Sequence, residues 1–196
     1  MMDKKTRKKQ EIIRASLHVM LEKGYNGTSI KDLTAAAGIP KGSLYNYFEN
    51  KEHYAKEALY FYYNEMNKEN FDILEDNTLD PLDRIKSFYR AMIIYYKDES
   101  QCKLGCFIGN LTLEMGGVNE AIREVTNEIH DRIVESIRKA LEEAIKKGQL
   151  SKTKNIDILA DFIASSWQGV LLRIKASNNK DMLDNFYKVL VEVLLK

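Results

Sequence analysis

Apolar residues recur every three to four positions along most of the chain, which is the spacing of one face of an α-helix. The repeat is clearest over residues 118–147, where the apolar positions are Ile122, Val125, Ile129, Ile133, Ile137, Leu141 and Ile145. No stretch alternates apolar and polar residues as a half-buried strand does. The pattern therefore predicts an all-α protein.

Glycine, proline and capping residues divide this periodic sequence into about nine helices. They are expected at about residues 4–23, 28–37, 40–47, 50–74, 81–97, 102–115, 118–147, 155–176 and 180–195. We expect Gly24 to end the first helix, Thr28 to cap the second and Asn50 to cap the fourth. Residues 75–81 and 98–101 are polar and are expected to be connections.

Residues 28–51 predict two short helices joined by a tight turn at Gly38, with Leu44 and Phe48 turned inward. The opposite side of the second helix carries small, hydroxyl-bearing and amide-bearing side chains, which suit the major groove of DNA. The residues expected to contact DNA bases or phosphates are Thr28, Lys41, Gly42, Ser43, Tyr45, Asn46, Tyr47 and Lys51. A three-helix corner with a polar surface that binds no DNA is the alternative.

The distribution of charge also favours a polyanionic partner for the N-terminal part. Residues 1–51 contain ten Lys/Arg and five Asp/Glu, although the net charge of the whole chain is only +1. The basic segment KKTRKK at residues 4–9 can add salt-dependent phosphate contacts. A solvated basic tail is the alternative reading of this segment.

The segment that predicts a DNA reader also resembles the signature of a known family. The matching positions are Gly24-Tyr25, Thr28-Ser29-Ile30, Asp32-Leu33, Ala37-Gly38-Ile39, Lys41-Gly42-Ser43-Leu44-Tyr45, Tyr47-Phe48 and Lys51-Glu52. Together they look like the helix-turn-helix signature of the TetR family of transcriptional regulators. Pro40 and Asn46 stand where that signature commonly varies, so they bear on the operator sequence.

The resemblance implies an all-α homodimer. Residues 1–51 would form a three-helix, helix-turn-helix DNA-binding domain, and residues 52–196 a ligand-binding and dimerisation domain. The eighth and ninth helices, expected at 155–176 and 180–195, would form a four-helix interface with their mates. A small-molecule effector bound among the fourth to eighth helices would shift the fourth helix and change the spacing of the two heads, which read a palindromic operator.

The expected function is therefore that of a ligand-responsive repressor that binds double-stranded operator DNA as a dimer and is released by an effector. A helical ligand-binding protein with a non-functional head is an alternative. No enzyme, metal or cofactor is expected, because the two cysteines and three histidines show no ligand or catalytic spacing. No apolar run approaches the ~20 residues that span a bilayer, so we expect a cytoplasmic protein without a membrane segment.

Aromatic and thioether side chains gather in the central helices and are candidates for an effector pocket. The candidates are Tyr62, Tyr89, Met92, Tyr96, Phe107 and Trp167. Such a lining suits a flat or lipophilic molecule, and no charged residue is an obvious counter-ion, which favours a neutral effector. Membership of the hydrophobic core is the alternative for each of them.

Cys106 is a candidate for an electrophile or redox sensor. It is expected in the first turn of the sixth helix, where the helix dipole and free N–H groups stabilise a thiolate. Its placement is similar to that in the NemR-like, electrophile-sensing branch of the family, in which a lysine late in the eighth helix partners the cysteine; Lys175 matches that lysine. A small buried thiol that only fills space is the alternative, and Cys102 is expected in a loop.

Overall fold

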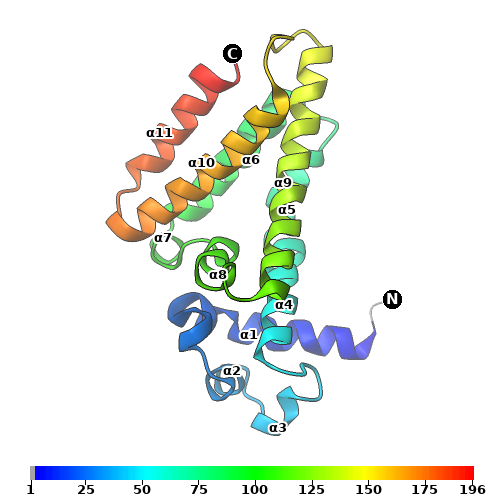
Figure 1. The fold of residues 1–196 in the computed structure, drawn as a ribbon, viewed down its shortest axis with the longest axis vertical. Coiled ribbons are helices and arrows are strands. Elements are labelled where there is room, and N and C mark those ends of the chain that lie inside the picture. The colour runs from blue at the N-terminus through cyan, green and yellow to red at the C-terminus, as the bar shows by residue number, and fades with distance from the viewer. Residues whose placement is uncertain (1–2) are drawn as a thin grey trace. The chain divides into compact units, whose positions relative to one another are not determined.

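The structure is a computed structural model that describes residues 3–196, apart from the side chains of residues 99–101. Every regular element in this range is helical (Figure 1), which confirms the all-α class. The elements are α1 (Lys4–Gly27), α2 (Ile30–Ala36), α3 (Lys41–Leu44), α4 (Lys51–Phe61), the π-helical turn η1 (Tyr62–Met66), α5 (Lys68–Glu75), α6 (Pro81–Lys97), α7 (Glu99–Leu104), α8 (Phe107–Met115), α9 (Glu120–Lys146), α10 (Ile156–Ser177), α11 (Asp181–Val189) and the π-helical turn η2 (Leu190–Leu194).

The helices gather into two compact units, neither of which is continuous in the sequence. We call them the reader unit, which contains the chain up to Met66 and Phe107–Asn127, and the body unit, which contains Asn67–Cys106 and Glu128–Lys196. Helix α9 belongs to both. The boundary that the sequence predicts after residue 51 separates an expected DNA-binding domain from an expected ligand-binding domain. It was not a prediction about packing units, and it stays a prediction.

The reader unit is built on the buried face of α1, which contacts α2, α4 and α8. Ile13, Leu17 and Met20 supply that face and are at most 2% exposed. Gly24 leaves helical geometry, with φ 74° and ψ 175°, where the first helix was predicted to end, but α1 resumes after this kink and ends at Gly27. The side chain of Asn50 accepts a hydrogen bond from the His53 backbone N–H and caps α4, which is also as predicted.

The single long helix predicted at residues 50–74 is wrong. Helix α4 ends at Phe61, η1 follows it, and α5 begins only at Lys68. Asn67 separates η1 from α5 with φ −110° and ψ 10°, outside helical geometry. Asparagine side chains compete for backbone hydrogen bonds, which weakens a helix at such a position.

The single helix predicted at residues 102–115 is also wrong, because α7 and α8 are separate. Gly105 lies between them at φ 71°, in the left-handed region that glycine adopts without steric cost. Helix α7 begins at Glu99, so residues 98–101 are not simply a connection, and Cys102 lies in a helix instead of the predicted loop.

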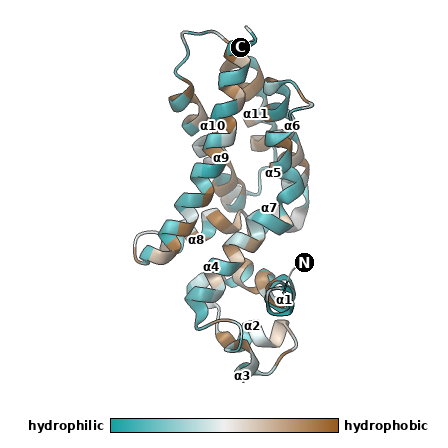
Figure 2. Cartoon of the chain, turned by 90° about the vertical axis from the view of Figure 1, so that its right-hand side faces the viewer, coloured by the Kyte–Doolittle hydropathy of each residue, from teal (hydrophilic) through white to brown (hydrophobic). Residues whose placement is uncertain are grey.

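The body unit packs α6 against α5, α7 and α11, and α10 against α7 and α11. Helices α10 and α11 lie side by side (Figure 1), and hydrophobic and hydrophilic residues alternate along the helices of both units (Figure 2). The predicted helix at 180–195 is present as α11 followed by η2. Of the helices in residues 3–196, none combines the length and apolar character that a membrane crossing requires.

Candidate nucleic-acid interface

Helix α2 begins with a capping box formed by Ser29 and Asp32. The Asp32 backbone N–H donates to Ser29 Oγ over 3.1 Å, and the Ser29 backbone N–H donates to Asp32 Oδ2 over 2.8 Å. The cap is therefore Ser29, one residue later than the predicted Thr28. A capping box satisfies two backbone donors at once, which explains why the serine with an aspartate three residues later is preferred.

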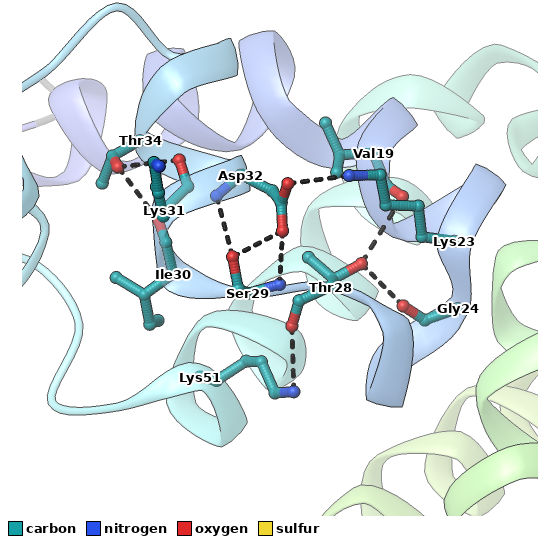
Figure 3. A network of polar contacts seen from close by, with 10 residues as sticks. All are labelled: Val19, Lys23, Gly24, Thr28, Ser29, Ile30, Lys31, Asp32, Thr34 and Lys51. Carbon is teal, nitrogen blue, oxygen red and sulfur yellow. Dashed lines mark hydrogen bonds and ion pairs between the residues drawn. The ribbon is translucent and has the colours of Figure 1, made fainter.

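Thr28 closes α1 instead of opening α2 (Figure 3). Its hydroxyl donates to the Gly24 carbonyl oxygen over 2.6 Å, and its side chain is buried, with 1% of the residue exposed. The structure thus places the Thr28 side chain inside the reader unit, and not on the surface where a base or phosphate contact was predicted.

A salt bridge ties α2 to α1 next to this cap. Lys23 Nζ lies 2.7 Å from Asp32 Oδ1 (Figure 3). The hydrogen bond from Lys23, followed by those from Ser29, holds the pKa of the Asp32 carboxyl well below its usual range. Asp32 is therefore charged over the physiological range and fixes the start of α2 to the end of α1.

Helix α3 is a single turn anchored by two buried side chains. It starts at Lys41 after Gly38, at φ 63°, and Pro40, and it is shorter than the predicted 40–47. The backbone N–H of Phe48 still donates to the Leu44 carbonyl oxygen over 2.9 Å, so the chain keeps turning beyond α3. Leu44 and Phe48 are both 0% exposed, which confirms their predicted inward orientation.

The side of this turn that faces away from Leu44 and Phe48 carries most of the predicted DNA contacts. Lys41, Gly42, Tyr45 and Asn46 are exposed, and Ser43 and Tyr47 are half-buried. Tyr45 is 51% exposed, so its ring and hydroxyl group can reach a partner. No atom lies within 4 Å of the position that a Gly42 Cβ would take, so the surface there is open to a close approach by a partner.

Lys51 has partners inside the protein that the sequence did not reveal. Its Nζ donates to the carbonyl oxygens of Tyr25 and Thr28, each over 3.0 Å, and lies 4.3 Å from the centre of the Tyr25 ring. The ammonium group thus closes the end of α1. An anion contact of Lys51 through its backbone N–H at the start of α4 stays a prediction.

The basic segment at residues 4–9 is helical and not a tail. Asp3 caps α1 through the backbone N–H groups of Lys5 and Thr6, so the helix starts at Lys4. The exposed basic residues of this first part are Lys4, Lys5, Arg7 and Lys8. Lys9 differs from them, because its Nζ lies 2.6 Å from Glu57 Oε1 and joins α1 to α4.

The predicted effector-pocket residues fall into two buried groups. In the reader unit the rings of Tyr62 and Phe107 lie 5.7 Å apart. In the body unit the Trp167 ring lies 5.3 Å from Tyr89 and 6.0 Å from Tyr96. Met92 is also buried. Phe186 of α11 also belongs to the second group, because its ring centre lies 5.0 Å from that of Tyr89. It was not among the predicted pocket residues, and its only signal in the sequence is its position on the apolar side of its helix.

A groove of about 390 Å³ lies elsewhere in the body unit, between the start of α10 and η2. Its lining residues are Lys154, Asn155, Ile158, Leu159, Phe162, Val193 and Leu194. Ile158 is 67% exposed, Phe162 54% and Val193 62%. The groove therefore forms part of an apolar surface shared by the two helices that were predicted to dimerise.

Cys106 precedes α8 and does not lie within its first turn, since α8 starts at Phe107. It is buried, with 8% of the residue exposed, and Lys175 is exposed in the last turn of α10. Cys102 is 0% exposed, and burial raises the pKa of its thiol. The structure thus leaves Cys106 the more accessible of the two thiols.

Comparison with known proteins identifies relatives over nearly the whole length. Residues 12–58 match the family described as "Bacterial regulatory proteins, tetR family", and residues 81–190 match "Tetracyclin repressor-like, C-terminal domain". The HTH-type transcriptional repressor DhaR of Mycobacterium sp. (strain GP1) is 34% identical over 187 residues, which cover 95% of this chain and 92% of that protein.

Two solved structures share the fold. The regulatory protein TetR from Rhodobacter sphaeroides superposes with a TM-score of 0.81 and 29% identity, covering 92% of this chain and 95% of that one. The reduced form of Escherichia coli NemR superposes with a TM-score of 0.84, covering 94% and 95%. Its identity is 21%, so this second likeness concerns the fold alone.

Proposed function

This chain belongs to the TetR family of transcriptional regulators, and on that premise we propose that it is a repressor that binds a palindromic operator as a homodimer and leaves it when a small molecule binds. The observation that carries the proposal is the surface of α3 and the turn after it. Leu44 and Phe48 anchor this short segment in the core, while Lys41 and Tyr45 are exposed on its other side.

We assign base readout to this surface and phosphate contacts to the helix ends around it. Gly42 and Ser43 allow a close approach to base edges, and Asn46 has the amide that pairs with an adenine edge. Lys41, Tyr45 and Tyr47 suit phosphate oxygens, as do the exposed basic residues at the start of α1. These assignments follow from side-chain chemistry and exposure.

The homodimer is proposed to form through α10, α11 and η2. Ile158, Phe162 and Val193 would be apolar surface exposed to water in a monomer, and an exposed patch of this kind marks an interaction site. A symmetric dimer also supplies what a palindrome requires, which is two readers separated by about 34–36 Å, one turn of DNA.

The effector is proposed to be neutral and flat or lipophilic, and to bind by repacking the aromatic group of Tyr89, Tyr96 and Trp167. The rings are in contact with one another, so an effector must select a more open arrangement that favours release from DNA. Trp167 is the single tryptophan of the chain, so its fluorescence reports directly on this site. An inducer that dissociates the DNA complex without altering that fluorescence would place the effector elsewhere.

Electrophile sensing through Cys106 is the alternative for the release step. Its position directly before α8 and its greater exposure than Cys102 support this alternative. Reaction with iodoacetamide at neutral pH tests it. A rate for Cys106 no higher than that of a free thiol contradicts the sensor role and leaves a buried structural thiol.

The experiment that tests the central proposal is a mobility shift with the DNA upstream of the gene and of its neighbours. We expect sequence-selective binding that weakens with salt, and a loss of at least about tenfold in affinity for Tyr45→Ala. Binding of equal strength to a scrambled fragment would contradict specific operator recognition.

A further inference from the structure

The last turn of α1, after the kink at Gly24, binds a carboxylate from a distant part of the chain. Glu114, near the end of α8, accepts hydrogen bonds from the backbone N–H groups of Tyr25 and Asn26, each over 2.6 Å. Two adjacent N–H groups that converge on one anion form a concave backbone site for negative charge. Charged acceptors make these bonds about twice as strong as neutral ones. Here the anion is supplied by the protein itself.

Gly24 makes room for this carboxylate. Its φ of 74° turns the following N–H groups toward Glu114, and a Cβ at Gly24 would lie 2.7 Å from Glu114 Oε2. No other residue avoids both the backbone strain and the collision. The backbone conformation at Gly24 therefore accommodates a side chain that lies 90 positions further along the chain.

The same turn is held from its other side by a positive charge. Lys51 Nζ binds the carbonyl oxygens of Tyr25 and Thr28, while Glu114 binds the N–H of Tyr25. The backbone of Tyr25 thus has an anion on its donor and a cation on its acceptor. Both contacts come from outside α1 and α2, so the angle between these two helices depends on α8 and α4.

A second contact joins the same two parts of the sequence. Asn119, directly before α9, donates through its side-chain amide to Glu52 Oε2 over 2.6 Å, next to Lys51 in α4. Burial, followed by the charges of Glu52 and Glu114, raises the pKa of the Tyr25 phenol. The phenol therefore stays neutral beside the side chains of Glu52 and Glu114.

We propose that Glu114 is the positioning residue that makes the orientation of the DNA reader depend on α8. The inference rests on the proposed DNA binding for its functional readout. Only the turn that ends at Ser29 separates Glu114's partners from α2, and α3 follows α2 after a tight turn. The chain enters the reader unit at Phe107, the first residue of α8. A displacement of α8 therefore pulls on the Tyr25 and Asn26 amides and tilts α2 and α3.

The first test is the substitution Glu114→Gln, with Glu120→Gln as its matched control. A glutamine keeps the length of the side chain, but its NH₂ group is itself a donor. It therefore cannot accept a hydrogen bond from one of the two backbone N–H groups, those of Tyr25 and Asn26. Glu120 is exposed at the start of α9 and undergoes the same chemical change. We expect about a tenfold loss of operator affinity for Glu114→Gln and none for the control, with the dimer intact. Unchanged affinity for Glu114→Gln would overturn the proposal.

The second test asks whether Glu114 transmits a displacement or only stabilises the fold. Phe107→Ala removes the ring that packs on Tyr62 and loosens the start of α8. It is expected to weaken operator binding in the wild-type background and to add nothing in the Glu114→Gln background, the non-additivity that marks coupled residues. If the two effects simply add, Glu114 is structural and the coupling role is wrong.

Hydrogen exchange of backbone amides tests the role of Glu114 without relying on DNA binding. In Glu114→Gln the backbone amides of Tyr25 and Asn26 are expected to exchange at least about tenfold faster, while that of Leu17 in the core of α1 keeps its rate. Failure of the wild-type protein to bind any operator would count against the proposed function alone. Unchanged exchange at Tyr25 and Asn26 would overturn the role of Glu114 itself.

Discussion

The ammonium nitrogen of Lys51 lies 4.3 Å from the centre of the Tyr25 ring and 3.0 Å from the Tyr25 carbonyl oxygen. Lysine at the end of a helix interacts favourably with the last carbonyl groups, which otherwise have no partner in the helix. Here that lysine comes from the first position of α4 and not from α1 itself. Lys51 is therefore a tertiary cap for α1.

Replacing Lys51 by methionine should lower the free energy of unfolding of the reader unit by about 1–3 kcal/mol. The change removes two hydrogen bonds from a charged donor and one cation–π contact, while the aliphatic stem is largely kept. Urea unfolding followed by circular dichroism measures it. Lys31→Met, at an exposed position of α2, is the control and should stay within about 0.5 kcal/mol of the wild type. Equal stability of the two variants would contradict the capping role.

Replacing Lys41 by methionine should act on DNA binding and not on folding. Lys41 is exposed at the start of α3, where we place a phosphate contact. Operator affinity should fall by a similar factor for all sequences, and the slope of log affinity against log salt should decrease by about one unit. Titrations at several salt concentrations measure both. A changed sequence preference with an unchanged slope would instead assign Lys41 to a base edge.

The position of the reader could be predicted because its determinants are local. Leu44 and Phe48 are spaced as one face of a turn, and Gly38 and Pro40 mark where that turn begins, so periodicity alone gives the segment and its exposed side. The prediction that Thr28 caps α2, where the structure has Ser29, also depended on residues that are close in the sequence. Both can cap a helix, and only the reciprocal bond with Asp32 decides between them.

The contacts that hold the reader could not be predicted, because their partners lie far apart in the sequence. Nothing near Glu114 indicates that its carboxylate binds the amides of Tyr25 and Asn26, and Lys51 has the charge expected of a phosphate contact. The separation of α7 from α8 at Gly105 could not be predicted either, because it also depends on contacts with distant parts of the chain. Glycine is tolerated within helices, so its φ of 71° depends on tertiary packing that the periodicity does not encode.

Replacing Phe162 by glutamate should convert the proposed dimer into monomers. Phe162 lines the groove between α10 and η2, and two copies of a charge buried in a symmetric interface lack partners. Sedimentation velocity at micromolar protein concentration measures the change, and operator binding should be lost with it. Ile94→Glu on α6 is the control, because Ile94 is also an exposed apolar residue, at 68%. A dimeric Phe162→Glu protein would exclude this surface as the interface.

Replacing Trp167 by alanine should destabilise the body unit by about 3–5 kcal/mol. The ring packs against Tyr89, Tyr96 and Phe186 and is 5% exposed, so its removal leaves a cavity lined by aromatic side chains. Thermal unfolding measures the loss. An apolar probe such as indole should restore part of it by filling the cavity, as ligands do that bind only the folded state. No rescue by indole would show that the site collapses and is unsuited to the proposed effector.

Replacing Asp32 by asparagine should make the stability of the protein less sensitive to acid. The hydrogen bond from Lys23, together with those from Ser29, lowers the pKa of Asp32 in the folded protein relative to its value of about 3.9 in an unfolded chain. A lowered folded-state pKa adds stability that is fully present above the unfolded value and is lost as the pH falls toward the folded one. Thermal midpoints of wild type and Asp32→Asn should therefore differ at pH 6–7 and converge as the pH is lowered below about 4. Asp131→Asn, at an exposed carboxylate of α9, is the control and should follow the wild-type curve. A difference that persists undiminished in acid would show that Asp32 stabilises α2 through its shape and hydrogen bonds alone, and not through its charge.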